Sequence, residues 1–330
     1  MSLEVLLLLA IATAYGLVSG FNDGGNLLAS FTAGRVVSPR LAAVLLLFVI
    51  AGPLLIGLGV ARTISSGVVD LTAVQAGGFV AVVTVSIAVV LGSWIARVPT
   101  SMTLALVGAM VGWAVAPGAG LTVRWPGVAR VLVGMPISIL AGLAGAFVLH
   151  RLFRLLLGRA DYLLLLRLAR LQVLSAILQA VAYGANDMEK TVGLATGAQS
   201  LGSSVAAVGF SDGASLALAA VSFFVGTLLG GWRLARRMGF GVVKVRPEEA
   251  LSQQLAASTA VAALAAAGAP VSSTQTIDGA LVGVGAAVRA SAIRWGVVRE
   301  MVFSWLVTLP VAFVVAFVAH GVLRELGAVR

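Results

Sequence analysis

Residues 20–26 read GFNDGGN, and residues 184–190 read GANDMEK. Both stretches place an Asn-Asp pair inside a long apolar segment of the chain. A carboxylate in such surroundings is energetically costly unless it has a partner or takes part in function, so a binding role is favoured for Asp23 and Asp187. The glycine at the start of each stretch allows the backbone to break beside the pair.

A second pair of similar stretches follows the first in the same order. Residues 99–103 read PTSMT, residues 270–274 read PVSST, and each is followed by a run of small residues. The spacing between the two kinds of motif is also similar in the two copies. Because two motifs recur in one order, the sequence predicts an internal duplication.

The composition of the chain indicates a membrane environment. Hydrophobic residues make up 60% of the 330 residues, charged residues make up 10%, and the mean hydropathy is +1.08. A soluble domain is about one-quarter charged, and a chain of this length cannot hide so much apolar surface from water. The apolar stretches are continuous rather than alternating, which favours helices over a membrane β-barrel. We therefore expect a multi-pass protein of the cell membrane in contact with lipid.

The net charge of +10 does not indicate nucleic-acid binding, because the cations lie in the connections between apolar stretches. The positive-inside rule places such connections in the cytoplasm. Two clusters carry many of them: Arg151, Arg154, Arg159, Arg167 and Arg170, and then Arg233, Arg236, Arg237, Lys244 and Arg246. The chain must cross the membrane an even number of times between the clusters. Since three apolar runs lie there, we expect one run not to span, or two runs to form one span, near residues 184–190.

Internal duplication in a membrane protein is typical of transporters. Their two repeats often have inverted topology, with the substrate site near the midplane between discontinuous helices. We predict an all-α membrane protein with about 10–12 transmembrane or re-entrant helices, in two inverted repeats with broken helices at the midplane. The first repeat is expected over residues 1–150, a basic cytoplasmic connection over 151–170, and the second repeat over 171–330.

The motifs that contain proline, serine and threonine have the chemistry of an anion site. Proline suits the first turn of a helix, and Ser or Thr can cap it. A helix N-terminus offers free N–H groups and positive dipole character, so two such termini facing each other would converge on one anion. Hydroxyls would add further donors: those of Ser101, Thr103, Ser272, Ser273 and Thr274. For each hydroxyl, the alternative is a bond to a neighbouring backbone carbonyl or helix.

The remaining chemistry of the sequence concerns cations. The carboxylates of Asp23 and Asp187, with nearby amide and backbone oxygens, would suit a small hard cation or a proton. The chain has no cysteine and only two distant histidines, His150 and His320, so neither a metal cluster nor a cofactor is expected. The sequence also lacks the HExxH, GxSxG and Walker motifs, which argues against an enzyme and against ATP-driven transport.

At its four motifs the sequence resembles the PiT family of inorganic phosphate transporters. That family is marked by a repeated GAND-type motif and a repeated P-[VTI]-S-x-T motif, and the resemblance covers essentially the whole chain. It implies a symporter that takes up inorganic phosphate by alternating access, driven by a proton or sodium gradient. A homodimer is compatible with the resemblance, although no residue requires it.

The resemblance also implies roles for individual residues. Carried over position by position, it implies a substrate site formed by Asn22, Ser101, Thr103, Asn186, Lys190, Ser272, Ser273 and Thr274. It implies a site for the coupling cation, H⁺ or Na⁺, formed by Asp23, Asn26 and Asp187. A sodium ion would lie at Asp23 and Asp187.

The chain departs from the family pattern in ways that concern the coupling ion. Many members carry Asn where this chain has Lys190, and the form with lysine resembles a bacterial subtype thought to be proton-coupled. Lys190 is expected to contact phosphate, to replace one sodium as an internal cation, or to pair with Glu189 or Asp187. A glutamate that many members carry is missing from Leu45–Ile50. The choice between proton and sodium stays open, and the alternatives are a sulfate permease of the same family or a passive anion channel.

Overall fold

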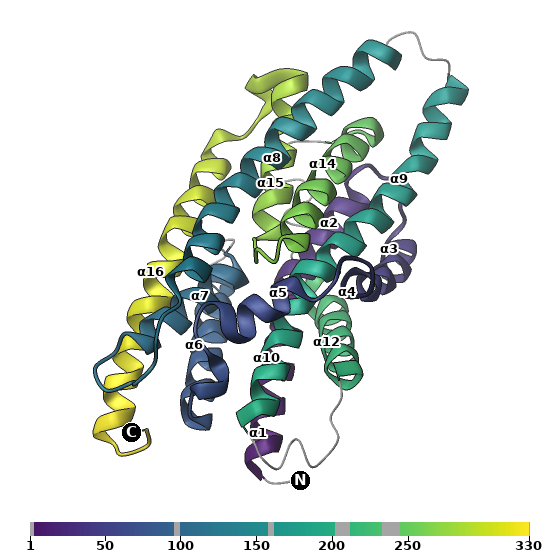
Figure 1. Ribbon diagram of the computed structural model, residues 1–330. Coiled ribbons are helices and arrows are strands. Elements are labelled where there is room, and N and C mark those ends of the chain that lie inside the picture. The colour runs from purple at the N-terminus through teal and green to yellow at the C-terminus, as the bar shows by residue number, and fades with distance from the viewer. Residues whose placement is uncertain (1–2, 96–99, 158–161, 202–211, 233–244, 330) are drawn as a thin grey trace.

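The structure, a computed structural model, describes residues 3–95, 100–157, 162–201, 212–232 and 245–329 (Figure 1). Within these residues the chain is helical and carries no β-sheet beyond one isolated bridge between Val69 and Val123. The first half contains α1 Leu3–Ser19, η1 Gly20–Gly24, α2 Gly25–Ala33, α3 Pro39–Leu45, η2 Leu46–Ile50, α4 Ala51–Ile56, α5 Gly59–Arg62, η3 Thr63–Gly67, η4 Leu71–Ala73, α6 Ala76–Ile95, α7 Met102–Ala114 and α8 Trp125–Leu157. The second half contains α9 Tyr162–Tyr183, η5 Gly184–Met188, α10 Glu189–Leu201, α12 Asp212–Gly226, η6 Thr227–Gly231, α14 Pro247–Ala266, α15 Ser273–Arg289, η7 Ala290–Ala292 and α16 Trp295–Glu325.

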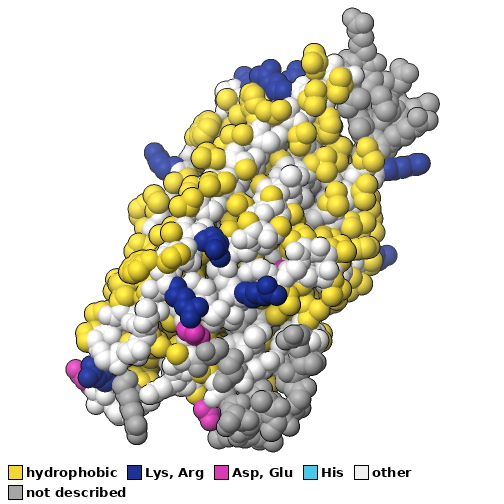
Figure 2. Space-filling view, viewed as in Figure 1, with side chains coloured by type: hydrophobic (Ala, Val, Ile, Leu, Met, Phe, Trp, Pro, Cys, Tyr) yellow, Lys and Arg dark blue, Asp and Glu magenta, His cyan; other side chains and the backbone are white. Residues whose placement is uncertain are grey.

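Long apolar helices confirm the predicted membrane protein. Among the described residues, six segments are long and apolar enough to cross a membrane: Leu6–Ala33, Pro39–Ile56, Ala76–Ile95, Trp125–Leu156, Gly213–Gly231 and Trp295–Glu325. Many of their Leu, Val and Phe side chains are exposed, and Figure 2 shows hydrophobic side chains over much of the face in view, with Lys and Arg at a few separate places. Lipid can cover these side chains, whereas water would not.

The two Asn-Asp motifs lie in helices that run in opposite directions. In Figure 1, α1, η1 and α2 form one helix that rises from the lower end, whereas α9, η5 and α10 form one that descends from the upper end. Each motif forms a π-helical turn of 5 residues. The helical backbone therefore continues through each motif, whereas the glycines had suggested a break there. A π turn widens the helix locally while keeping its backbone hydrogen-bonded, which a lipid environment favours.

The first glycine of each motif lies against a backbone of the other half. A Cβ added to Gly20 would lie 2.1 Å from the carbonyl oxygen of Phe223 in α12. A Cβ added to Gly184 would lie 1.8 Å from the carbonyl oxygen of Val49 in η2. These glycines are required for close packing between the halves.

The interruptions expected at the midplane lie at the hydroxyl motifs. In Figure 1, α6 and α7 enter from the lower end, and α14 and α15 enter from the upper end. Helices α7 and α15 both begin near the centre of the molecule and run outward in opposite directions. Each hairpin therefore stops inside the molecule, which is the re-entrant arrangement predicted from the sequence.

Two long helices hold the hairpins, and each belongs to the opposite half. Helix α8 packs along α15, and α16 packs along α7. The small residues after the hydroxyl motifs make this contact close. Glycines at matching positions meet a backbone carbonyl: Gly108 meets Leu309, Gly112 meets Phe313, Gly279 meets Ile139, and Gly283 meets Leu143.

The two basic clusters flank two crossings. Helix α9 continues through η5 into α10 as one helix, and α12 with η6 returns, so two of the three apolar runs form one span. The end of α8, with Arg154, and the start of α14, with Arg246, both lie at the upper end of Figure 1. Five other members lie outside the described residues: Arg159, Arg233, Arg236, Arg237 and Lys244. The side chain of Arg167 also lies outside what the structure describes. Because α8 continues to Leu157, the predicted connection over 151–170 is mostly helical, and the domain limits stay a prediction.

Candidate functional site

A buried serine caps each of the two central helices. Ser101 Oγ accepts a hydrogen bond of 3.3 Å from the N–H of Leu104, and Ser272 Oγ accepts one of 3.4 Å from the N–H of Gln275. Both serines have extended backbone conformations, as N-cap residues do. The predicted helix starts are confirmed, whereas Pro99, at the start of the first motif, lies outside the described residues. The first N–H groups of α7 and α15 have no partner within their own helix.

The asparagine of each Asn-Asp motif holds the residue that precedes the serine cap. Asn22 Nδ2 donates to the carbonyl oxygen of Thr100 at 3.4 Å. Asn186 Nδ2 donates to the carbonyl oxygen of Val271 at 2.9 Å, and its Oδ1 accepts from the N–H of Val271 at 3.0 Å. The π turns therefore fix the start of both central helices.

The carboxylate of Asp23 is surrounded by neutral polar groups. It accepts hydrogen bonds from Ser19 Oγ at 3.2 Å, from Asn22 Nδ2 at 2.9 Å and from Thr274 Oγ1 at 3.1 Å. Asn26 Nδ2 in turn donates to Thr274 Oγ1 at 3.0 Å. No Lys, Arg or His of the described part of the chain forms an ion pair with Asp23. The charge of this buried carboxylate has no cationic partner there.

The carboxylate of Asp187 has a cationic partner in the same helix. Lys190 Nζ lies 2.6 Å from Asp187 Oδ1, and both side chains are buried. Asn186 Nδ2 donates to the same oxygen at 3.1 Å, whereas Asp187 Oδ2 has no hydrogen-bond partner. Of the two partners considered for Lys190, the structure selects Asp187 rather than Glu189.

The carbonyl oxygen of Val271 joins the two halves. It accepts from Asn186, from Lys190 Nζ at 3.0 Å and from Thr103 Oγ1 at 2.8 Å. Thr103 belongs to the first half, so its hydroxyl crosses to the second, while Thr274 crosses the other way to Asp23. Each Asn-Asp motif is therefore linked to a hydroxyl of the opposite repeat.

All predicted site residues lie in this central region. Each is buried, and most are linked by the hydrogen bonds above: Asn22, Asp23, Asn26, Ser101, Thr103, Asn186, Asp187, Lys190, Ser272, Ser273 and Thr274. Ser273 Oγ takes part by accepting from Asn186 Nδ2 at 2.7 Å. The arrangement offers hydroxyls and helix N-termini for an anion next to carboxylates for a cation.

Two acidic residues of this region were not among the predicted site residues, and one of them, Glu189, had been considered only as a partner of Lys190. Glu189 Oε2 accepts from the N–H groups of Val60 and Ala61, at 2.9 and 3.1 Å, and so holds the start of α5. Asp278 is buried in α15 one turn beyond Thr274, and its Oδ2 has no hydrogen-bond partner. The signal for both was available, because each is an acidic residue beside or within an apolar segment.

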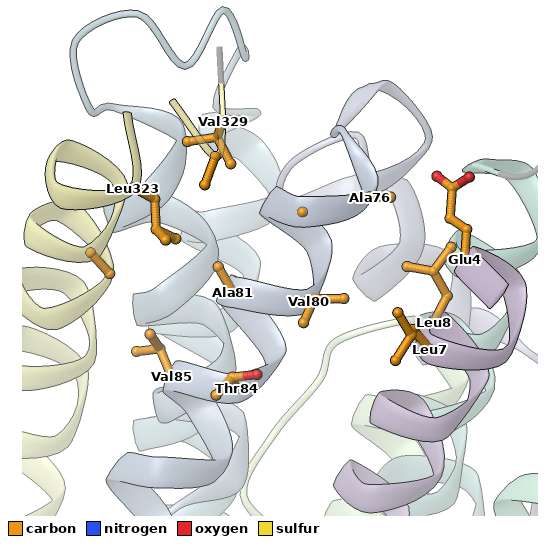
Figure 3. Close-up of a pocket in the computed structure, with 13 residues that line it drawn as sticks. Glu4, Leu7, Leu8, Ala76, Val80, Ala81, Thr84, Val85, Leu323 and Val329 are labelled. Atoms are coloured by element: carbon orange, nitrogen blue, oxygen red, sulfur yellow. The ribbon is translucent and has the colours of Figure 1, made fainter. Parts of the chain in front are cut away.

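A separate pocket of about 500 Å³ lies between α1, α6 and α16, away from the central site (Figure 3). Of its lining side chains, only Glu4 and Thr84 carry polar atoms. An anion would meet apolar walls and a carboxylate there, so this pocket does not suit an oxyanion.

Comparison with known proteins agrees with this geometry. The sequence profile described as "Phosphate transporter family" matches residues 19–166 and, a second time, residues 159–316. The chain belongs to this family. Its members are transporters and not enzymes, and the double match is consistent with the two repeats.

Individual relatives are similar over nearly the whole chain. The probable low-affinity inorganic phosphate transporter of Mycobacterium bovis is 32% identical over 99% of this chain and 80% of its own length. The corresponding protein of Bacillus subtilis is 26% identical over 98% of this chain and 99% of its own. Among solved structures, one titled "The sodium-dependent phosphate transporter" matches with a TM-score of 0.84 at 19% identity, over 98% of this chain and all of that one. This last likeness shows the fold.

Proposed function

We propose that the protein is a symporter that moves inorganic phosphate across the cell membrane together with a cation, by alternating access. The observation that carries the proposal is the meeting of two serine-capped helix N-termini, α7 and α15, at the centre of a membrane protein. Each terminus is held by an Asn-Asp π turn of its own half. Membership in the phosphate transporter family supports phosphate as the anion.

The chemistry of the central region suits a tetrahedral oxyanion. Such an anion needs donors from several directions, and here they come from the N-termini of two opposed helices. We assign its contacts to the asparagines Asn22 and Asn186, to Lys190 and to the hydroxyls Ser101, Thr103, Ser272, Ser273 and Thr274. Protonated phosphate can donate a hydrogen bond to an acceptor such as the Asp23 carboxylate, whereas sulfate cannot, which favours phosphate.

The coupling cation is assigned to the first half. Asp23 is encircled by hydroxyl and amide groups, with Asn26 one turn away, and has no cationic partner among the described residues. Asp187, the other carboxylate expected to hold a cation, already lies 2.6 Å from the ammonium of Lys190. We propose that Lys190 acts as a built-in cation in the second half and that an exchangeable proton or sodium ion binds near Asp23.

The inverted arrangement supports alternating access. The hairpin α6–α7 enters from one side of the molecule and α14–α15 enters from the other, so the central site lies between their tips. Movement of one hairpin with its supporting helix would open the site to one side while the other hairpin keeps it closed. Binding of the cation would offset the charge of phosphate in a setting from which water is excluded.

Uptake of radiolabelled phosphate into proteoliposomes tests this function. Sodium or proton gradients are imposed separately, and unlabelled sulfate is added in excess as a competitor. Phosphate uptake driven by one gradient and insensitive to sulfate is the expected result. Strong competition by sulfate with poor phosphate uptake would make the protein a sulfate permease. Movement of anions down their own gradient, with no effect of either cation, would make it a passive anion channel.

A further inference from the structure

Asp278 is a buried carboxylate for which the site described above has no use. It lies in α15, is 4% exposed, and one of its oxygens has no hydrogen-bond partner. No hydrogen bond or ion pair of Asp278 is found among the described residues. The matching position of the first repeat, the fourth residue after Thr103, is Val107. A structural role would require a hydrogen-bond or ion-pair partner, or an acidic residue at the matching position of the first repeat. The described residues provide neither.

The helices around α15 place no cation near this carboxylate. Helix α15 packs against α8, α14, α2 and η7, and the last two contain no charged residue. The titratable groups of the other two are Arg130, His150, Arg151 and Arg154 in α8, and Glu248 and Glu249 in α14.

Position along the helices separates those groups from Asp278. Gly279 lies against Ile139 of α8, so Arg130 and His150 are about 13 and 16 Å away along that helix. The two glutamates of α14 lie in its first turn, far from the hairpin tip. The titratable groups at the start of α15 are Asp23, which accepts a hydrogen bond from Thr274 one turn before Asp278, and Lys190, which donates to the carbonyl oxygen of Val271 and is paired with Asp187.

The position of Asp278 links its charge to the anion. Thr274 and Asp278 are four residues apart on one helix and therefore share a face. An ionised Asp278 would repel an oxyanion held at Ser272–Thr274, and at this separation a unit charge changes affinity by on the order of tenfold to a hundredfold. Protonation of Asp278 removes the repulsion. By reciprocity, bound phosphate must then favour the protonated carboxyl group.

We propose that Asp278 carries a proton that is coupled to phosphate transport, in addition to the cation bound near Asp23. An O–H bond forms on its carboxylate when the site is open to the side from which phosphate enters, with the proton taken from water. The same bond breaks when the site opens to the other side, and the proton returns to water there. A lone carboxylate suits a proton, whereas sodium requires several oxygen ligands of the kind found around Asp23. The inference rests on the proposed phosphate symport.

Two transport assays on the full-length protein in proteoliposomes separate the proton step from phosphate binding. The first is exchange of external radiolabelled phosphate for internal phosphate at equal pH, which needs no net proton movement. The second is net uptake with external pH held constant, so that external phosphate keeps its ionisation state, while internal pH is raised. In Asp278→Asn the carboxyl group is replaced by a permanently neutral group of equal size. We expect this variant to exchange phosphate within about threefold of the wild type and to lose at least about tenfold in accumulation driven by the pH gradient.

The conservative variant Asp278→Glu keeps the proton-binding group and should retain gradient-driven accumulation. Accumulation by Asp278→Asn at the wild-type level would overturn the inference. Loss of exchange in both variants would also overturn it, because it would place Asp278 in packing rather than in coupling. A wild-type protein that neither exchanges nor accumulates phosphate would instead contradict the proposed function itself.

Discussion

The two halves of the central site share one backbone plan and differ in charge. In both, an Asn-Asp π turn holds the residue before a serine-capped helix, and a threonine hydroxyl crosses to the opposite half. The first motif ends in Asn26 and leaves Asp23 without a cationic partner among the described residues, whereas the second ends in Lys190, which binds Asp187. The geometry has been kept through the duplication, and the charges have diverged.

This difference separates two requirements of transport. A tetrahedral anion must be held from two sides, so the capped helix ends are needed in both halves. Of the two motif carboxylates, we propose that Asp23 binds an exchangeable cation, whereas Asp187 is satisfied by the fixed ammonium of Lys190. The comparison predicts that changes in the first half affect coupling most, and that changes in the second affect stability as well.

Asp23→Asn is the strongest test of the first half. The amide cannot carry the negative charge that holds a cation, so we expect net phosphate uptake to fall about a hundredfold or more, as for the loss of a charged hydrogen-bonding group. Thermal unfolding of the detergent-purified variant should change little, because its buried neutral partners can still bond to the amide. Asp187→Asn should abolish uptake too, but with a lower melting temperature, since Lys190 would lose its partner. Normal uptake by Asp23→Asn would refute the assignment.

Lys190→Asn gives the second motif the same last residue as the first motif, which ends in Asn26. It removes one partner of a buried ion pair and should destabilise the protein by about 3–5 kcal/mol, measured by thermal unfolding in potassium-free choline buffer. The double variant with Asp187→Asn should recover much of this loss, because no unpaired charge remains. If Lys190 stands in for a cation, added sodium should stabilise Lys190→Asn more than the wild type, in which the ammonium already occupies the second site. An equal response of both proteins to sodium would contradict the built-in cation.

Much of this arrangement could be read from the sequence. The duplicated motifs predicted the inverted repeats, the serine caps and the grouping of distant polar residues at the centre, because an anion site inside a membrane requires polar groups from both halves. The form of the Asn-Asp turns was not predictable, since glycine permits both a break and a π turn. The close contacts of Gly184 and Gly20 with the backbones of Val49 and Phe223 could not be predicted either, because those residues come from elsewhere in the chain.

The roles of Glu189 and Asp278 show a second limit of prediction from the sequence. The rule that marked Asp23 as functional applies to both of them, but their roles depend on tertiary neighbours. Glu189 faces the start of α5, a contact between residues 129 positions apart. Asp278 stands out because no partner is found among the described residues, and only the folded arrangement can show this.

Gly184→Ala and Gly20→Ala test whether both π turns pack closely against the backbone of the opposite half. Each added methyl group would collide with a carbonyl oxygen of the opposite half, at 1.8 and 2.1 Å, so both should cost about 1–3 kcal/mol or more in unfolding free energy. Gly92→Ala in α6 is the matched control, because nothing lies within 4 Å of its added Cβ. It should be neutral or stabilising by up to about 1 kcal/mol. Two variants no less stable than this control would show that the glycines do not set the packing.

Ser101→Ala and Ser272→Ala have the smallest expected effects. They test directly whether the serine-capped helix starts of the two halves serve the same purpose. Loss of an N-cap costs about 0.5–2 kcal/mol, and loss of a hydroxyl donor near the anion should raise the KM for phosphate about threefold to tenfold. Ser38→Ala is a control outside the site, because Ser38 caps α3 in the same way and should lower stability without changing KM. Since the caps occupy equivalent positions on two opposed helices, both site variants should raise KM by similar factors. A rise in only one of them would place the anion on one helix end, and the duplication would then serve the exchange of access rather than the binding of phosphate.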